Sequence, residues 1–294
     1  MTSRERVLCA FRHQQADRIP IDLSGHRSSG IAARAYPALR AALGLAPKPT
    51  YIYDPVQQLA IVHDDVLDCL QVDTIELGRG FCQDERWWVD WTPPCGQPCR
   101  MPSWAVPEPA GAEWVIRAPS GRIIARMPEG AEHFDQIWWP FLDGPEDLNR
   151  IEDLYPEHMW TGVSAPPGPS IQTTDELSAG AARLRASNSR AIIGLFGGNL
   201  LEMGQFYYRM DQFLMLMAED PARVHRFLDA LVEIHLRNLD RFLGAVGPYI
   251  DIISFGDDLG AQHGPQISPR MIGSSSSTGT SSCGHAPARS RQSR

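Results

Sequence analysis

Along most of this chain, short apolar runs alternate with segments whose apolar residues recur with the period of an α-helix. Four runs have the composition of buried strands, and they cover residues 17–23, 72–78, 191–198 and 249–256. Several of the segments between them carry apolar residues at three- and four-residue spacing, which is typical of helices that bury one face. Strands that alternate with helices in this way predict parallel βαβ units and an α/β fold.

Capping signals indicate where three helices begin. Thr2 and Glu5 have the spacing of a capping box, in which each side chain bonds to the backbone of the other. Asp54 followed by Pro55 combines an N-cap with a proline at the first helical position, and predicts a helix through Leu70. Residues 220–221 repeat that pair and open a long amphipathic helix.

The pattern changes in two segments. Between residues 86 and 128, two β-rich runs at 113–117 and 122–126 are separated by Ala-Pro-Ser-Gly, which predicts an antiparallel hairpin insertion. Residues 273–294 lack acidic residues and apolar periodicity while serine, glycine and arginine accumulate. This segment is predicted to be disordered, because it cannot bury enough apolar surface to offset its ordering entropy. An aberrant ending or a natural flexible tail would each account for it.

Composition narrows the possible partners. The 294 residues carry a net charge of -8, which argues against nucleic acid as the main partner. No apolar window approaches the length of a membrane span, and the first residues predict an amphipathic helix rather than a signal peptide. We therefore expect a cytoplasmic protein with reduced cysteines. Cys95 and Cys99 are separated by three residues, which is a weak pattern for a metal site.

Polar residues that follow the predicted strands are the candidates for chemistry. The tips of parallel strands in a barrel converge on one face, where acid–base chemistry and binding of a polycarboxylate are both expected. After the first two strands these residues are Asp22, His26, Arg27, Glu76 and Arg79. After the last two they are Asn199, Glu202, Asp257, Asp258 and His263.

Asp257 and Asp258 are the candidate catalytic residues, and the others are candidate substrate-binding residues. Neighbouring side chains on an extended segment point to opposite faces, so only one of the two aspartates is expected in the site, and the other is available to cap a helix. A purely structural capping role for the pair stays open. His263 could act as a base, act as a ligand, or be an exposed loop histidine without a role in the site. The glycines at 197–198 suit either an anion site or close strand–helix packing.

Several segments together resemble the uroporphyrinogen decarboxylase superfamily. They are residues 2–8, 17–23, 193–199 (Ile-Gly-Leu-Phe-Gly-Gly-Asn), 255–262 (Phe-Gly-Asp-Asp-Leu-Gly-Ala-Gln) and 264–269. The resemblance implies a TIM-type barrel with its active site at the carboxyl ends of the strands. It also implies either cofactor-independent porphyrinogen decarboxylation or zinc- and corrinoid-linked methyl transfer.

The chain departs from the decarboxylases of that superfamily at four places. Their Arg-Gln-Ala-Gly-Arg run is replaced by residues 24–30, which contain one arginine, and their essential aspartate falls near Gly80. Their Gly-Ala-Pro-Trp-Thr-Leu segment reads Gly-Gly-Asn-Leu-Leu-Glu at 197–202, and Asp257 stands where they have a serine. The resemblance is therefore closer to the methyltransferase-like and uncharacterised branches.

The methyltransferase relatives bind zinc through a His-x-Cys motif and a later cysteine in the second half of the barrel. Cys283 and His285 reverse the order of that motif, so no metal ligand is assigned in this chain. Zinc and a corrinoid are expected only in an intact parent. The candidate partners are a tetrapyrrole or a methyl donor, together with a corrinoid protein.

The sequence thus predicts an α/β fold, a TIM-type (β/α)8 barrel truncated after about four strands, over residues 1–272. The expected parent activity is corrinoid-linked methyl transfer, in which Asp257 or Glu202 orients substrate. The first alternative is decarboxylation, in which Arg27 pairs with a substrate acetate and Asp257 stabilises a protonated pyrrole. The second alternative is an inactive fragment or a self-associating binding protein.

Overall fold

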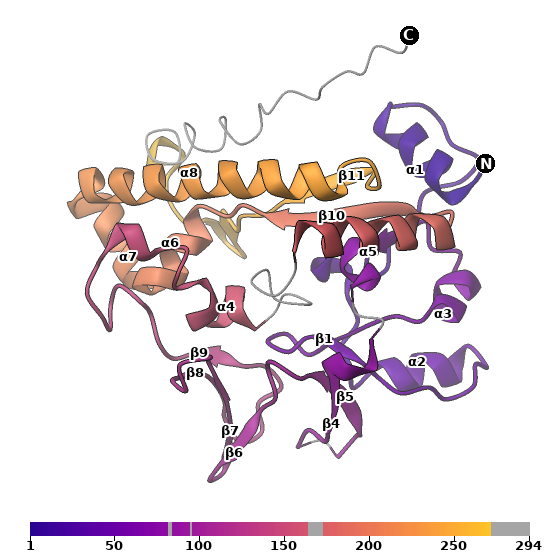
Figure 1. The fold of residues 1–294 in the computed structure, drawn as a ribbon, viewed down its shortest axis with the longest axis horizontal. Coiled ribbons are helices and arrows are strands. Elements are labelled where there is room, and N and C mark those ends of the chain that lie inside the picture. Colours follow the sequence, from indigo (N-terminus) through magenta and orange to yellow (C-terminus); the bar gives the residue numbers. More distant parts are fainter. Residues whose placement is uncertain (82–83, 95, 164–172, 272–294) are drawn as a thin grey trace. The chain divides into compact units, whose positions relative to one another are not determined.

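The computed structural model describes residues 1–81, 84–94, 96–163 and 173–271. Figure 1 shows the ribbon of the chain. The chain divides into two compact units. Unit 1 comprises Met1–Trp138, Asp153–Leu195 and Phe242–Ser254, and unit 2 comprises Trp139–Glu152, Phe196–Arg241 and the chain from Phe255 onwards. The predicted disorder of residues 273–294 lies outside the described residues.

A three-stranded parallel sheet lies mainly in unit 1. Its order is β11-β10-β3, with β3 at Thr74–Glu76, β10 at Ala191–Gly197 and β11 at Ile252–Phe255. β3 and β10 pair in parallel register, with Ile192 opposite Ile75. The first four residues of β10 are buried, as expected for a strand covered on both faces.

Helices and short antiparallel sheets make up the rest of unit 1. The helices are α1 (Ser3–Phe11), α2 (Tyr36–Ala42), α3 (Asp64–Cys69), α4 (Met159–Gly162) and α5 (Thr174–Ser187). β1 (Ile52–Asp54) pairs with β2 (Leu59–Ala60), and β4 (Trp88–Trp91) pairs with β5 (Cys99–Pro102). A four-stranded antiparallel sheet contains β6 (Glu108–Ala110), β7 (Glu113–Arg117), β8 (Ile123–Met127) and β9 (Asp135–Gln136). β7 and β8 form the hairpin at the place where the sequence predicts one.

The prediction of a TIM-type barrel, whole or truncated, is wrong. The described residues form five small separate sheets, of which one is parallel, and none of them closes. Residues 17–23 form no strand, because Arg18 and the N–H of Ile21 bond to Asp73 while Asp22 closes a turn with Gly25. The helix predicted from Asp54 is replaced by the β1–β2 hairpin followed by α3 alone.

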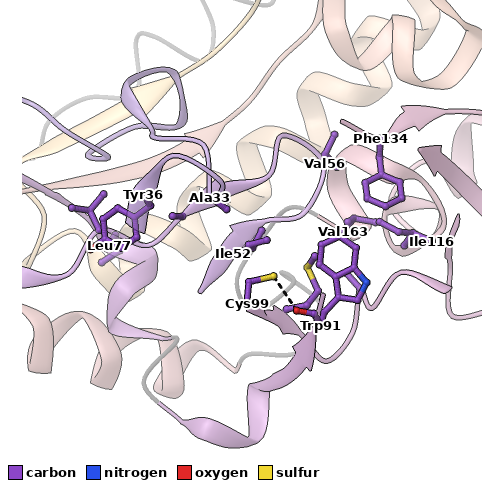
Figure 2. Close-up of a cluster of buried hydrophobic side chains, with 14 of the residues drawn as sticks. Ala33, Tyr36, Ile52, Val56, Leu77, Trp91, Cys99, Ile116, Phe134 and Val163 are labelled. Atoms are coloured by element: carbon purple, nitrogen blue, oxygen red, sulfur yellow. Dashed lines mark hydrogen bonds between the residues drawn. The ribbon is translucent and has the colours of Figure 1, made fainter. Parts of the chain in front are cut away.

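One hydrophobic cluster joins the amino-terminal half of unit 1 to its antiparallel sheets. Figure 2 shows Ile52 of β1 beside Cys99 and Trp91, with Ile116 and Phe134 on the far side. The Cys99 Sγ–H donates to the Trp91 carbonyl oxygen at 3.3 Å. These contacts tie β1, which carries part of the candidate site, to the β4–β5 pair.

A buried charged residue precedes each strand of the parallel sheet. Asp73 precedes β3 and accepts hydrogen bonds from Arg6 Nη1 at 2.6 Å and Arg18 Nη1 at 2.7 Å. Arg190 precedes β10 and donates to the Val72 carbonyl oxygen at 3.0 Å. Asp251 precedes β11 and accepts from Arg4 Nε at 2.6 Å and from the N–H of Ile192 at 3.0 Å. The contacts of Arg6 with Asp73 and of Arg4 with Asp251 connect α1 to the amino-terminal ends of β3 and β11.

Unit 2 is built around helices and an aromatic cluster. It contains α6 (Leu201–Tyr208), α7 (Met210–Glu219), the first part of α8 (Pro221–Val246), and the β12 (Gly260–Ala261) and β13 (Gly264–Pro265) pair. Rings from both α6 and α7 pack against Phe227 of α8, and Phe227 also packs against Phe141. In the described part of the chain, every helix is too short or too polar to cross a bilayer.

Candidate functional site

Four segments of unit 1 surround a small pocket. The first is the loop after residue 22, which includes a 3-10 turn at Arg27–Ser29, and the second is β1. The third is the pair of residues after β2, and the fourth is the end of β3, which continues directly into a 3-10 turn at Leu77–Gly80. The pocket contains about 260 Å³ of empty space, including its open mouth, and is lined by Ser24, Tyr53, Ile61, Val62, Glu76, Gly78 and Arg79.

Two hydroxyl groups in the pocket wall have no hydrogen-bond partner among the described residues. They are Ser24 Oγ and Tyr53 Oη, in side chains that are only 7% and 5% exposed. A buried polar group without a partner costs about 1–3 kcal/mol, so native proteins seldom leave one unpaired without a reason. Burial raises the pKa of Tyr53 well above its usual value, so its phenol stays protonated and can donate a hydrogen bond.

Glu76 and Arg79 add ionisable groups to the same wall. Burial raises the pKa of Glu76, although the N–H of Gly78 and the charges of Arg27 and Arg79 oppose that shift. Burial also lowers the pKa of Arg79, whose Nη2 lies 3.5 Å from Asp64 Oδ1. The pocket therefore combines a carboxyl group that holds its proton to higher pH than usual with a guanidinium group.

Gly78 makes room for the Glu76 carboxyl group. A Cβ atom at position 78 would lie 2.6 and 2.7 Å from the two carboxyl oxygens of Glu76. Any larger residue would push that carboxyl group away from its present position, so the glycine contributes to the geometry of the pocket.

The other predicted residues of unit 1 shape the loop next to the pocket. Asp22 Oδ1 accepts hydrogen bonds from Thr74 Oγ1 and from the N–H of Gly25. His26 Nδ1 accepts from the N–H of Ser28 at 3.1 Å, and burial followed by the nearby Arg27 charge lowers the His26 pKa. These bonds hold the loop that presents Ser24.

Arg27 is paired within the protein. Its Nε lies 3.4 Å from Asp54 Oδ2, whose side chain is fully buried. Asp54 also accepts from the backbone N–H of Gln57 at 3.0 Å and from its side-chain amide at 3.1 Å. The pair links the predicted substrate-binding loop to β1, the strand that carries Tyr53.

Asp257 in unit 2 caps a helix. Its carboxylate accepts backbone N–H bonds from Leu200 at 2.9 Å, Leu201 at 2.8 Å and Glu202 at 2.9 Å, at the start of α6. Burial raises the pKa of Asp257, and these three N–H groups oppose the shift. Since both carboxylate oxygens are engaged, this geometry favours the structural capping alternative for Asp257.

The remaining candidates of unit 2 lie around that cap. Glu202 accepts from Asn199 Nδ2 and from the N–H of Asp258, and burial raises the pKa of Glu202. The Asn199 carbonyl oxygen lies 3.0 Å from Nε2 of His235. His263 is exposed at the turn between β12 and β13. The geometry brings Asn199, Glu202, Asp257 and the Asp258 backbone together, while the His263 side chain faces solvent.

Replacing Asp257 with alanine is expected to lower the free energy of unfolding by about 1–2 kcal/mol, because three N–H groups at the start of α6 lose their acceptor. Urea denaturation followed by circular dichroism measures the change. Asp258→Ala is the matched control, because it removes the neighbouring carboxylate and leaves the cap in place. Equal losses in the two variants would contradict the capping role.

The sequence predicts one site, whereas the candidate residues fall into the two units. Asp22, His26, Arg27, Glu76 and Arg79 belong to unit 1, and the other five belong to unit 2. Sequence reasoning missed Ser24 and Tyr53. No local signal marks either residue, because an unpaired buried hydroxyl group is a property of the folded chain.

The chain matches no family model, no curated protein and no solved structure. The resemblance to the uroporphyrinogen decarboxylase superfamily therefore stays a prediction. Among the described residues, no group of three or more histidine, cysteine, aspartate or glutamate side chains is placed to hold a metal ion.

Proposed function

We propose that the pocket of unit 1 binds a carboxylate group of a small organic acid, and that Glu76 transfers a proton to the bound substrate. The observation that carries the proposal is the pair of buried hydroxyl groups, on Ser24 and Tyr53, that have no protein partner and line the pocket. Two hydroxyl donors and the Arg79 guanidinium group match the acceptor oxygens of a carboxylate.

Glu76 suits the role of a general acid. A proton donor works best when its pKa lies close to the working pH, and burial shifts the pKa of Glu76 in that direction. Loss of CO2 from a substrate breaks a carbon–carbon bond and leaves the electron pair on carbon. A proton from Glu76 would then complete the product, and the resulting Glu76 carboxylate would lie near the Arg27 and Arg79 charges.

The size of the pocket and the chemistry of its side chains bear on the two activities that the resemblance implies, decarboxylation and methyl transfer. The pocket is small, so a whole tetrapyrrole would have to remain outside it, with at most one acidic group at its mouth. Decarboxylation of a carboxylated tetrapyrrole requires a carboxylate pocket and a proton donor, and the proposal assigns these roles to this pocket and to Glu76. The geometry therefore favours the decarboxylation alternative over corrinoid-linked methyl transfer.

Binding of succinate and of the octa-acid uroporphyrin tests the proposal by calorimetry. Tyr53→Phe is expected to weaken both by roughly 10-fold or more, since a hydrogen bond to a charged group contributes about 1.5–3 kcal/mol. The same substitution should not lower the free energy of unfolding, because it removes a hydroxyl group that has no protein partner.

Tyr51→Phe is the matched control. Tyr51 lies two residues away, and its hydroxyl donates to Glu85 at 2.9 Å instead of lining the pocket. Its loss should leave carboxylate binding unchanged. Equal binding of succinate and the uncharged succinamide, or equal affinity of the Tyr53→Phe variant and the unmodified protein, would contradict the proposal.

A further inference from the structure

A second pocket of unit 1 is larger than the first and shares no lining residue with it. It contains about 590 Å³ of empty space when its open mouth is included. Its walls come from the turn before α2, from β1, from the β4–β5 connection and from the segment after β8. Because these segments enclose it on several sides, it suits one compact molecule rather than a strand or helix of a partner.

The walls of this second pocket are mainly apolar. Ile52, Met127 and Ala131 line it together with Pro93 and Pro94. Ile52 is fully buried within the core cluster drawn in Figure 2. Burying an apolar ring against such walls contributes roughly 25 cal/mol for each Å² of apolar surface removed from water.

Arg34 and Glu132 of the second pocket neutralise each other, and the lining also includes the imidazole of His133. Arg34 Nη1 is hydrogen-bonded to Glu132 Oε1, and both side chains belong to the pocket lining. Gln58 donates its side-chain amide to the Pro55 carbonyl oxygen at 2.6 Å, which leaves its own oxygen as an acceptor. Gln97 supplies another neutral amide. The pocket thus offers hydrogen bonds without an unbalanced carboxylate or guanidinium group.

From this combination we propose that the second pocket binds an uncharged molecule of one or two rings, with a polar edge that bonds to the glutamine amides. A charged ligand would lose its hydration against apolar walls without meeting an unpaired opposite charge. This site is independent of the proposed carboxylate pocket.

Saturation-transfer NMR and calorimetry on the full chain test the proposal, with indole as the neutral probe and indole-3-carboxylate as its charged counterpart. Indole is expected to bind at least 10-fold more tightly than the carboxylate. Ala131→Phe should weaken indole binding at least 10-fold, because the added ring occupies the pocket. Tyr53→Phe, which alters the first pocket alone, should leave indole binding unchanged.

Gln97→Ala provides a second variant. Gln97 is a partly exposed loop residue, so its truncation does not require the pocket wall to repack. It should weaken indole roughly 5-fold, the equivalent of one hydrogen bond of about 1 kcal/mol. Equal affinity for the two probes would overturn the proposal. Unchanged indole binding in a folded Ala131→Phe variant would also overturn the proposal. If the Ala131→Phe variant does not fold, unchanged indole binding in the Gln97→Ala variant would overturn it instead.

Discussion

Replacing Asp73 with alanine is expected to lower the free energy of unfolding by about 3–5 kcal/mol, the loss typical of breaking a buried ion pair from one side. Asp73 is fully buried and accepts hydrogen bonds from two arginines, Arg6 and Arg18, and from the N–H of Ile21 at 2.9 Å. The Arg6 side chain is itself buried. Without the carboxylate, Arg6 would still contact Asp17, but it would lose its fully buried partner.

The same residue should make stability depend on pH. Burial alone would raise the pKa of Asp73, but hydrogen bonds from Ile21, Arg18, Ser3 and Arg6 outweigh burial and hold that pKa below its usual value. A carboxyl group with a lower pKa in the folded state stabilises the protein above its unfolded pKa, near 3.9. That contribution is lost as the pH falls through the folded pKa. Asp73→Asn should therefore show a weaker loss of stability on acidification than the unmodified protein.

Urea denaturation at neutral and acidic pH measures both effects. Asp68→Ala is the control, because Asp68 pairs with Arg190 but its side chain is 72% exposed. Because the Asp68 carboxylate faces water and Arg190 keeps its bond to the Val72 carbonyl oxygen, this variant should lose less stability than Asp73→Ala. A loss in Asp73→Ala no greater than that in Asp68→Ala would refute the structural role assigned to Asp73.

Local signals in the sequence predict several elements well. β10 and β11 lie within apolar runs, and α8 begins at Pro221, where Asp220 precedes a long amphipathic pattern. The capping box predicted at Thr2 and Glu5 is confirmed by reciprocal side-chain bonds. In these places the residues that determine the structure are close in sequence, so the chain pattern alone is sufficient.

The segment after Asp54 shows why other elements could not be predicted. An aspartate followed by proline begins a helix or a turn with the same local chemistry. Here the Asp54 carboxylate accepts the N–H of Gln57 and closes a turn, and Leu59 then pairs back onto Asp54. Pairing with a neighbouring strand decides whether the segment forms a helix or a turn. The local sequence pattern around Asp54 carries no information about that neighbouring strand.

The barrel prediction failed for a related reason. It required parallel pairing among strands far apart in sequence, whereas β4 to β9 pair with their sequence neighbours in antiparallel sheets. The position of Glu76 at a strand end could be predicted, because β3 follows from its apolar run. The unpaired hydroxyl groups of Ser24 and Tyr53 could not be predicted. Their lack of hydrogen-bond partners depends on how segments distant in sequence pack together in the folded chain.

Replacing Gly204 with alanine is expected to lower the free energy of unfolding by about 1–3 kcal/mol, although alanine is the better helix former. A Cβ atom at position 204 of α6 would lie 2.1 Å from two ring atoms of Phe213 in α7. Phe213 is only 1% exposed and packs against Tyr208 and Phe227 at ring-centroid distances of 5.8 and 5.9 Å. Because those rings surround it, Phe213 cannot move aside without disturbing the aromatic cluster.

Gly244→Ala is the matched control, since the substitution is the same and the position is also helical. Gly244 lies near the end of α8, is exposed, and would have nothing within 4 Å of an added Cβ atom. Alanine there should raise the free energy of unfolding by about 0.5–1 kcal/mol, through helix propensity alone. Chemical denaturation of both variants should give changes of opposite sign. Stabilisation by both substitutions would mean that α6 and α7 are not packed as closely as the Gly204–Phe213 contact requires.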